Sequence, residues 1–219
     1  MTTAIIGVGQ IGSTLARNLV GGGERVVLVN RDKSKAVKLA RQLGDLASAA
    51  DIGDAISEAD VIVLAVHFDV MLAMIPQYGQ RLVGKIVVDP SNPVGPDGKG
   101  GMIKTIPEDK SSGQIVARLL PKGARFVKAF GTLSAGSLES GAWRTPERAV
   151  LFYATDDPGA GDQVARLIVA SGFDAVKVGG VDQSIRIEVG GDLHQHGGLS
   201  GRLVNVEEAE ALTIGAAAA

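Results

Sequence analysis

Short apolar runs alternate along this chain with segments in which apolar residues recur at helical spacing. Seven runs are continuously apolar and rich in β-branched residues, as strands covered on both faces usually are; they are residues 3–8, 25–29, 61–66, 86–89, 126–130, 149–154 and 175–178. The segments between them carry apolar stripes, such as Ile11, Leu15 and Leu19, and Ala36, Leu39, Ala40 and Leu43. This order predicts an α/β fold of Rossmann type, a doubly wound, mostly parallel sheet with helices on both faces.

The first predicted strand runs into "AIIGVGQIG", in which Gly7, Gly9 and Gly12 have the spacing G-x-G-x-x-G. The first glycine permits a tight turn, the second lets the backbone approach a pyrophosphate, and the third lets the helix pack close to the strand. The helix start then offers free N–H groups to the phosphates. The motif is weak alone, but here it joins a strand to an amphipathic helix. It predicts a dinucleotide site, with a glycine turn that binds no ligand as the alternative.

The second predicted strand ends in "VVLVNRDKSK", without the acidic residue that often holds the adenine ribose of NAD. An amide at Asn30 can donate to a 2′-phosphate, and the Arg31 guanidinium can grip it with paired charge-assisted bonds. Lys35 lies four residues beyond Arg31, which on a helix puts both cations on one side. The cofactor that fits is therefore NADP(H). The alternative is a solvated, basic helix start.

Three further strands end in loops that should border the same ligand crevice. "VIVLAVH" ends at His67, "VVDPSNP" contains Ser91, Asn92 and Pro93, and "KAFGTLSAG" follows the fifth strand. Each loop could line the nicotinamide end of the cofactor, or could be ordinary turn chemistry. His67 could donate a proton, although a packed or solvated histidine is the more common case.

Composition excludes several other classes of protein. The 219 residues carry a net charge of −2, which points neither to nucleic acid nor to an anionic membrane. The chain has no cysteine, no apolar run long enough to span a membrane and no signal-peptide pattern, so we expect a cytoplasmic protein. Asp192, His194 and His196 suggest a metal site, but no further ligand is evident, and we expect no metal.

The ordered set of motifs resembles the NADP oxidoreductases that depend on the deazaflavin coenzyme F420, a family related to the cytosolic domain of ferric reductases. The resemblance covers nearly the whole chain, from "AIIGVGQIG" to "SIRIEVGG". It implies an NADP-dependent reductase in which Asn30, Arg31 and Lys35 hold the 2′-phosphate. The other cofactor contacts that it implies are Gln10, Ile11, Ala65, Val66, His67 and Ala135. His67 departs from the family, where this position is commonly proline or apolar.

We therefore predict hydride transfer between NADPH and a flat small-molecule acceptor, such as coenzyme F420 or a flavin. The alternatives are a non-catalytic NADPH-binding redox sensor and a small imine or carbonyl reductase. Residues 1–180 should form the NADP-binding domain, and residues 181–219 an extension that packs on it or on the mate in a homodimer. Residues 92–110 should form an exposed flap, Arg186 and Glu188 a structural pair, and the tail "GAAAA" a frayed end.

Overall fold

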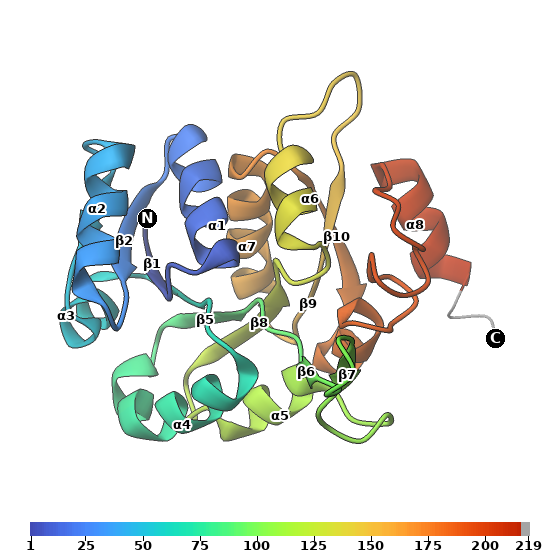
Figure 1. Ribbon diagram of the computed structural model, residues 1–219, viewed down its shortest axis with the longest axis horizontal. Coiled ribbons are helices and arrows are strands. Elements are labelled where there is room, and N and C mark those ends of the chain that lie inside the picture. The colour runs from blue at the N-terminus through green and yellow to red at the C-terminus, as the bar shows by residue number, and fades with distance from the viewer. Residues whose placement is uncertain (216–219) are drawn as a thin grey trace.

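In the computed structural model, residues 1–215 are described, and they build one eight-stranded sheet with helices on both faces (Figure 1). The strand order is β10-β9-β8-β5-β4-β1-β2-β3. The neighbouring strands pair in parallel except for β8 and β9, which are antiparallel. The predicted fold class, a Rossmann-type α/β fold with a mostly parallel sheet, is therefore confirmed.

The elements have the following bounds. The strands of the sheet are β1 (Thr2–Ile6), β2 (Arg25–Val29), β3 (Ala47–Ala49), β4 (Val61–Leu64), β5 (Ile86–Asp89), β8 (Arg125–Ala129), β9 (Val150–Ala154) and β10 (Asp174–Gly179). The helices are α1 (Gln10–Gly21), α2 (Lys33–Leu43), α3 (Ile52–Glu58), α4 (Phe68–Tyr78), α5 (Ser112–Leu119), α6 (Ala135–Ser140), α7 (Pro158–Ala170) and α8 (Val206–Gly215). Two 3₁₀ segments, η1 (Gly79–Leu82) and η2 (Val181–Ile187), complete them.

Side-chain alternation along the strands divides the core between the two faces of the sheet. Ile5 points into a cluster with α1, α2, α6 and α7, whereas its neighbours Ala4 and Ile6 point into a cluster with α3, α4 and α5. Both sets are buried, which explains why the strands read as continuous apolar runs rather than as alternating ones. The two faces can be followed in Figure 1, where α1 and α7 lie above the sheet and α4 and α5 below it.

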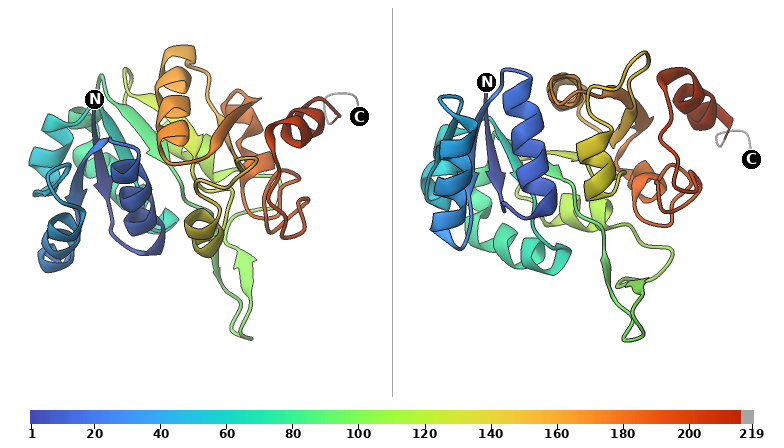
Figure 2. Two further views of the ribbon diagram at one scale, coloured as in Figure 1. Left: turned by 90° about the horizontal axis from the view of Figure 1, so that it is seen from above. Right: turned by 45° about the horizontal axis from the view of Figure 1, so that its top comes forward.

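The segment expected to be a flap folds into a separate two-stranded hairpin, β6 (Val94–Pro96) and β7 (Met102–Lys104). It projects away from the body of the molecule (Figure 2). Met102 and Ile103 on it are 63% and 54% exposed. Sequence reasoning missed this hairpin and also β3, because both consist of three-residue strands without an apolar run. Closure of the hairpin over a ligand stays a prediction.

The chain after β10 packs against the same molecule. Ile187, Leu193, Leu199, Val204 and Ala209 form a third apolar cluster with one face of β9 and β10. The predicted pair of Arg186 with Glu188 is wrong, because Arg186 instead pairs with Asp192 at 2.8 Å. Of the tail predicted to fray, all residues after Gly215 lie outside the described range. None of the helices in residues 1–215 is both long and apolar enough for a membrane span.

Candidate dinucleotide site

Two of the three motif glycines are required by the protein itself. Gly7 follows β1 in the left-handed region, with φ of 101°, and its N–H donates to the Val29 carbonyl oxygen at 2.8 Å. A Cβ on Gly7 would lie 2.3 Å from the Ala65 carbonyl oxygen, and a Cβ on Gly12 would lie 1.9 Å from the Gly7 carbonyl oxygen. Both glycines therefore permit close packing of the turn, as the motif predicts.

Gly9 is different, because no contact within the described part of the chain requires a glycine there. Its φ of −71° suits any residue, and a Cβ built on it would have no neighbouring atom within 4 Å. Gly9 caps the N-terminus of α1 without a side chain, so the N–H groups of Gln10, Ile11 and Gly12 have no partner within the helix. The space in front of this helix start fits a pyrophosphate, which needs donors and a close approach to the backbone.

Asn30 ties the glycine turn to the end of β2. Its Oδ1 accepts a hydrogen bond from the Val8 N–H at 3.2 Å, and its Nδ2 donates to the Asp32 carbonyl oxygen at 3.1 Å. Asp32 in turn caps α2 by accepting from the Ser34 N–H. The amide of Asn30 therefore holds two parts of the site together, a role that the sequence pattern did not indicate.

Arg31 and Lys35 are exposed, and their side chains make no hydrogen bond or ion pair with any residue in the range 1–215. Lys33, which lies between them, pairs with Asp51. The i, i+4 spacing on a helix does not apply here, because α2 begins only at Lys33 and Arg31 precedes it. The two free cations nonetheless flank the start of α2, next to the glycine turn.

The loops after β4 and β5 lie along the same edge of the sheet. The Ala65 carbonyl faces Gly7, Val66 is partly buried, and His67 is exposed at the N-cap of α4. After β5, Ser91 is buried, and Pro93 leads into the hairpin, where its carbonyl oxygen accepts from Thr105 N–H at 2.7 Å. These loops bring the predicted nicotinamide-side residues to one edge, as parallel strands require.

The amide of Asn92 is engaged on both sides by the chain. Its Nδ2 donates to the Gly131 carbonyl oxygen at 2.9 Å, and its Oδ1 accepts from the Val189 N–H at 2.7 Å. Asn92 therefore links the loop after β5 to the loop after β8 and to the C-terminal segment. Ala135, the remaining predicted contact, is the first residue of α6 and is half-buried.

A buried charge cluster, which sequence reasoning missed, lies behind these loops. Lys128 is 1% exposed, and its Nζ donates to Asp89 Oδ2 at 2.8 Å, to the Ser91 carbonyl oxygen at 2.6 Å and to Ser112 Oγ at 3.0 Å. Glu188, also buried, accepts from the N–H groups of Ser112 and Gly113 at the start of α5 and lies 3.8 Å from Lys128 Nζ. The cluster joins β5, β8, α5 and the C-terminal segment.

His194 is buried with both ring nitrogens satisfied. Its Nε2 lies 3.0 Å from the Gly131 carbonyl oxygen, and its Nδ1 accepts from the His196 N–H at 2.9 Å. Nδ1 carries no proton because it accepts this hydrogen bond, and Nε2 carries one because a carbonyl oxygen can only accept. The ring is therefore neutral. Burial lowers the pKa of His194 to about 4, and His196 and Lys128 act in the same direction. No cluster of His, Cys, Asp or Glu within the described residues could hold a metal ion.

This lowered pKa predicts a pH-dependent stability. Because the unfolded chain takes up the proton near its ordinary value of 6.5 and the folded chain only near 4, His194 contributes fully above pH 6.5. Its contribution is lost as the pH falls through this window, by roughly 3 kcal/mol in total. Chemical denaturation at a series of pH values tests this. His194→Gln should lose less stability than wild type between pH 6.5 and 4. The same change in stability with pH in both proteins would show that His194 is not its source.

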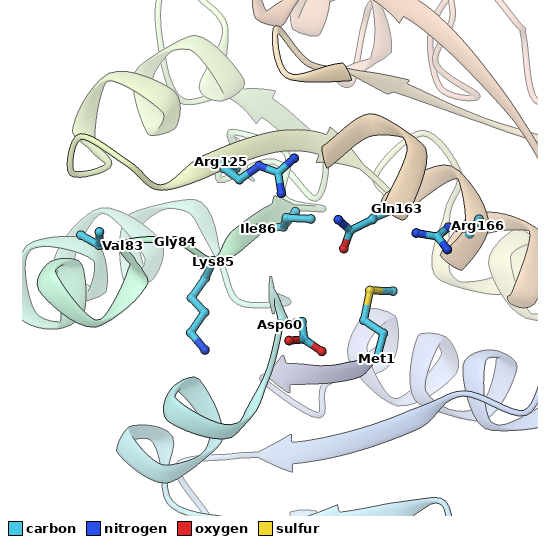
Figure 3. Close-up of a pocket in the computed structure, with 9 residues that line it drawn as sticks. All are labelled: Met1, Asp60, Val83, Gly84, Lys85, Ile86, Arg125, Gln163 and Arg166. Carbon is cyan, nitrogen blue, oxygen red and sulfur yellow. The ribbon is translucent and has the colours of Figure 1, made fainter. Parts of the chain in front are cut away.

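A polar cavity of about 690 Å³ opens at the opposite edge of the sheet (Figure 3). Its lining includes Asp60, Lys85 and Arg125, which stand at or next to the amino ends of β4, β5 and β8. Arg125 is already paired with Asp157 by two hydrogen bonds, and this guanidinium holds the pKa of Asp157 well below its usual range. The cavity is therefore distinct from the candidate site, which lies at the carboxyl ends of the strands.

The chain is similar to several known proteins. The family described as NADP oxidoreductase, coenzyme F420-dependent, matches residues 2–93. An F420-dependent NADP reductase from Methanothermobacter marburgensis is 30% identical over 148 residues, which make up 63% of this chain and 66% of that protein. The metalloreductase STEAP3 from Rattus norvegicus is 30% identical over 187 residues, 84% of this chain and 35% of that protein. The solved structure of a hypothetical protein from Sinorhizobium meliloti has a TM-score of 0.80 at 30% identity, over 94% of this chain and 95% of that one.

The alignment spans only part of either named relative, 66% of the archaeal reductase and 35% of the rat metalloreductase. The residues that match the family contain the glycine turn, the cations beside α2 and the loop after β4. They are the parts of the chain whose geometry fits a phosphorylated dinucleotide. Residues 2–93 of this chain therefore match the family of coenzyme F420-dependent NADP oxidoreductases.

Proposed function

We propose that this protein binds NADP(H) across the glycine turn and is an NADP-dependent reductase. The observation that carries the proposal is the open space at Gly9, in front of a helix start whose N–H groups have no partner within the helix. Gly9, Gln10 and Ile11 would hold the pyrophosphate, and Arg31 and Lys35 the 2′-phosphate. Asn30 would support both by fixing the turn to the end of β2.

The nicotinamide end would lie over the loops that follow β4, β5 and β8. Ala65, Val66 and His67 would form one side, Ser91, Asn92 and Pro93 the next, and Ala135 the third. Two buried hydroxyls in these loops, Ser91 Oγ and Thr132 Oγ1, have no hydrogen-bond partner among residues 1–215. Unpaired buried hydroxyls are unusual and mark places where a polar ligand group would be favourable.

We propose a flat redox acceptor, coenzyme F420 or a flavin, as the second substrate. When bound, NADPH supplies the hydride, and transfer to such a ring requires stacking and orientation rather than a strong acid or base. His67 would be an exposed residue beside this ring, and its side chain makes no hydrogen bond within residues 1–215 that would orient it as a proton donor. The name of the archaeal relative supports coenzyme F420 as the acceptor. A cytoplasmic location and a homodimer stay predictions from the sequence.

Arg31→Ala should weaken NADPH binding by about tenfold to a hundredfold and leave NADH binding almost unchanged. The guanidinium–phosphate contact contributes on the order of 1.5–3 kcal/mol to NADPH binding. NADH has no 2′-phosphate and therefore does not make this contact. Fluorescence titration with both cofactors measures this. Lys33→Ala is the matched control, because Lys33 is a neighbouring exposed cation that is already paired with Asp51. Equal weakening toward NADPH and NADH would exclude Arg31 from the phosphate site.

His67→Ala distinguishes a flat redox acceptor from an imine or carbonyl. With a flat ring no proton donor is essential, so turnover should fall by less than about fivefold. Steady-state rates with the best acceptor from a screen, together with the NADPH dissociation constant, give the answer. A loss of about a hundredfold at unchanged NADPH affinity would instead support proton donation and an imine or carbonyl substrate.

A further inference from the structure

The loop after β8, residues 130–134, has a strained backbone. Phe130 has a φ of 66° and is fully buried, although a bulky side chain disfavours the left-handed region. The next residue, Gly131, lies so close to the loop after β5 that a Cβ on it would be 2.6 Å from the Pro90 carbonyl oxygen. Such a conformation persists only where the surroundings enforce it, and strain of this kind gathers at functional sites.

The C-terminal segment supplies the contacts that enforce it. His194 Nε2 donates to the Gly131 carbonyl oxygen at 3.0 Å, where Asn92 also donates. The Gln195 N–H donates to the Thr132 carbonyl oxygen at 3.0 Å, and Gln195 Oε1 accepts from the Ser134 N–H at 2.9 Å. Two adjacent residues of the C-terminal segment thus make three hydrogen bonds to this one loop, at Gly131, Thr132 and Ser134.

His194 and Gln195 are themselves held in place. The His196 N–H occupies the other ring nitrogen of His194 at 2.9 Å. Gln195 Nε2 donates to Ser137 Oγ at 2.7 Å and to the Gly201 carbonyl oxygen at 3.0 Å. Both side chains are at least nine-tenths buried. Their hydrogen-bonding groups are therefore preorganised toward residues 130–134 rather than toward solvent.

We propose that His194 and Gln195 are positioning residues for hydride transfer, which act by holding residues 130–134 in their strained shape at the nicotinamide end. The inference rests on the proposed function, since that is what puts the nicotinamide beside this loop. It makes the C-terminal segment part of the reductase site, although neither residue touches the cofactor. The adenosine and pyrophosphate would be held at the other end, by the glycine turn and the cations beside α2. Displacement of the loop should therefore change turnover much more than NADPH affinity.

Two substitutions of His194 separate this role from a purely structural one. Gln can present its amide near the position of Nε2 and keep the donor to Gly131. Asn can present its oxygen near the position of Nδ1 and keep only the acceptor for His196 N–H. His194→Asn should lower kcat on the order of tenfold with the NADPH dissociation constant changed less than about twofold, whereas His194→Gln should keep most of kcat.

Hydrogen–deuterium exchange of residues 131–134 gives a readout that does not depend on activity. Exchange should be faster in His194→Asn than in His194→Gln and wild type. Equal kcat in the two variants, or a loss that only follows NADPH affinity, would overturn the proposal, and so would unchanged exchange in His194→Asn. Wild-type protein that binds no NADPH would contradict the proposed function itself, and the exchange data would still decide whether His194 holds the loop.

Discussion

Replacing Gly9 by valine is expected to abolish NADPH binding without unfolding the protein. The extended backbone at Gly9, with φ of −71° and ψ of −163°, is one that valine adopts readily, and a Cβ there would have no neighbouring atom of residues 1–215 within 4 Å. The new side chain would instead fill the space in front of the α1 N-terminus, where we propose the pyrophosphate lies. The dissociation constant for NADPH should rise by at least about a hundredfold, or roughly 3 kcal/mol.

Gly21→Val is the matched control for this substitution. Gly21 lies at the other end of the same helix, is exposed, and also has no atom within 4 Å of a built Cβ. The NADPH dissociation constant of Gly21→Val should stay within about twofold of the wild-type value, since the substitution is remote from the glycine turn. Titration of both variants, with circular dichroism to confirm folding, gives the comparison. Tight NADPH binding by folded Gly9→Val protein would rule out the glycine turn as the cofactor site.

Lys128→Met is expected to lower the free energy of unfolding by about 3–5 kcal/mol, because Asp89 and Glu188 would be left buried without their cation. The Asp89 carboxylate is fully buried and 2.8 Å from Lys128 Nζ, so water cannot replace the lost charge. The loops of the site share this cluster through the Ser91 carbonyl. Urea denaturation of wild type and variant measures the loss.

Lys122→Met provides the control, because Lys122 is an exposed lysine that makes no hydrogen bond or ion pair with any of residues 1–215. The free energy of unfolding of the Lys122→Met variant should differ from that of wild type by less than about 0.5 kcal/mol. Asp89→Asn combined with Lys128→Met should recover part of the loss, since it removes one of the uncompensated charges. A loss for Lys128→Met as small as that for Lys122→Met would show that the buried cluster contributes little to stability.

The sequence predicts the sheet and the glycine turn well because local patterns determine them. Continuous apolar runs give strands that are covered on both faces, and the turn glycines have fixed spacing. The predicted first strand, residues 3–8, ends two residues later than β1, since Gly7 turns away from the sheet at φ of 101°. Strand β3 is too short and too rich in small residues to give a periodic signal.

Contacts between distant residues are what the sequence pattern could not supply. Lys128 reads as the polar position of a strand, and its partner Asp89 is 39 residues away. His194 resembles a metal ligand in "GGDLHQHGG", yet its partner is a backbone carbonyl 63 residues away. Asn30 suggests a phosphate donor because its type and place fit, and the hydrogen bonds of its amide to the turn become visible only in the fold.

Rapid mixing of the NADPH-loaded protein with oxidised coenzyme F420, or with a free flavin, tests the central claim most directly. We expect the absorbance of bound NADPH to disappear in a single turnover, with reduction of the acceptor at a matching rate and no reaction in Gly9→Val. NADPH that binds tightly and stays reduced with every acceptor tried would contradict the account and favour a non-catalytic sensor.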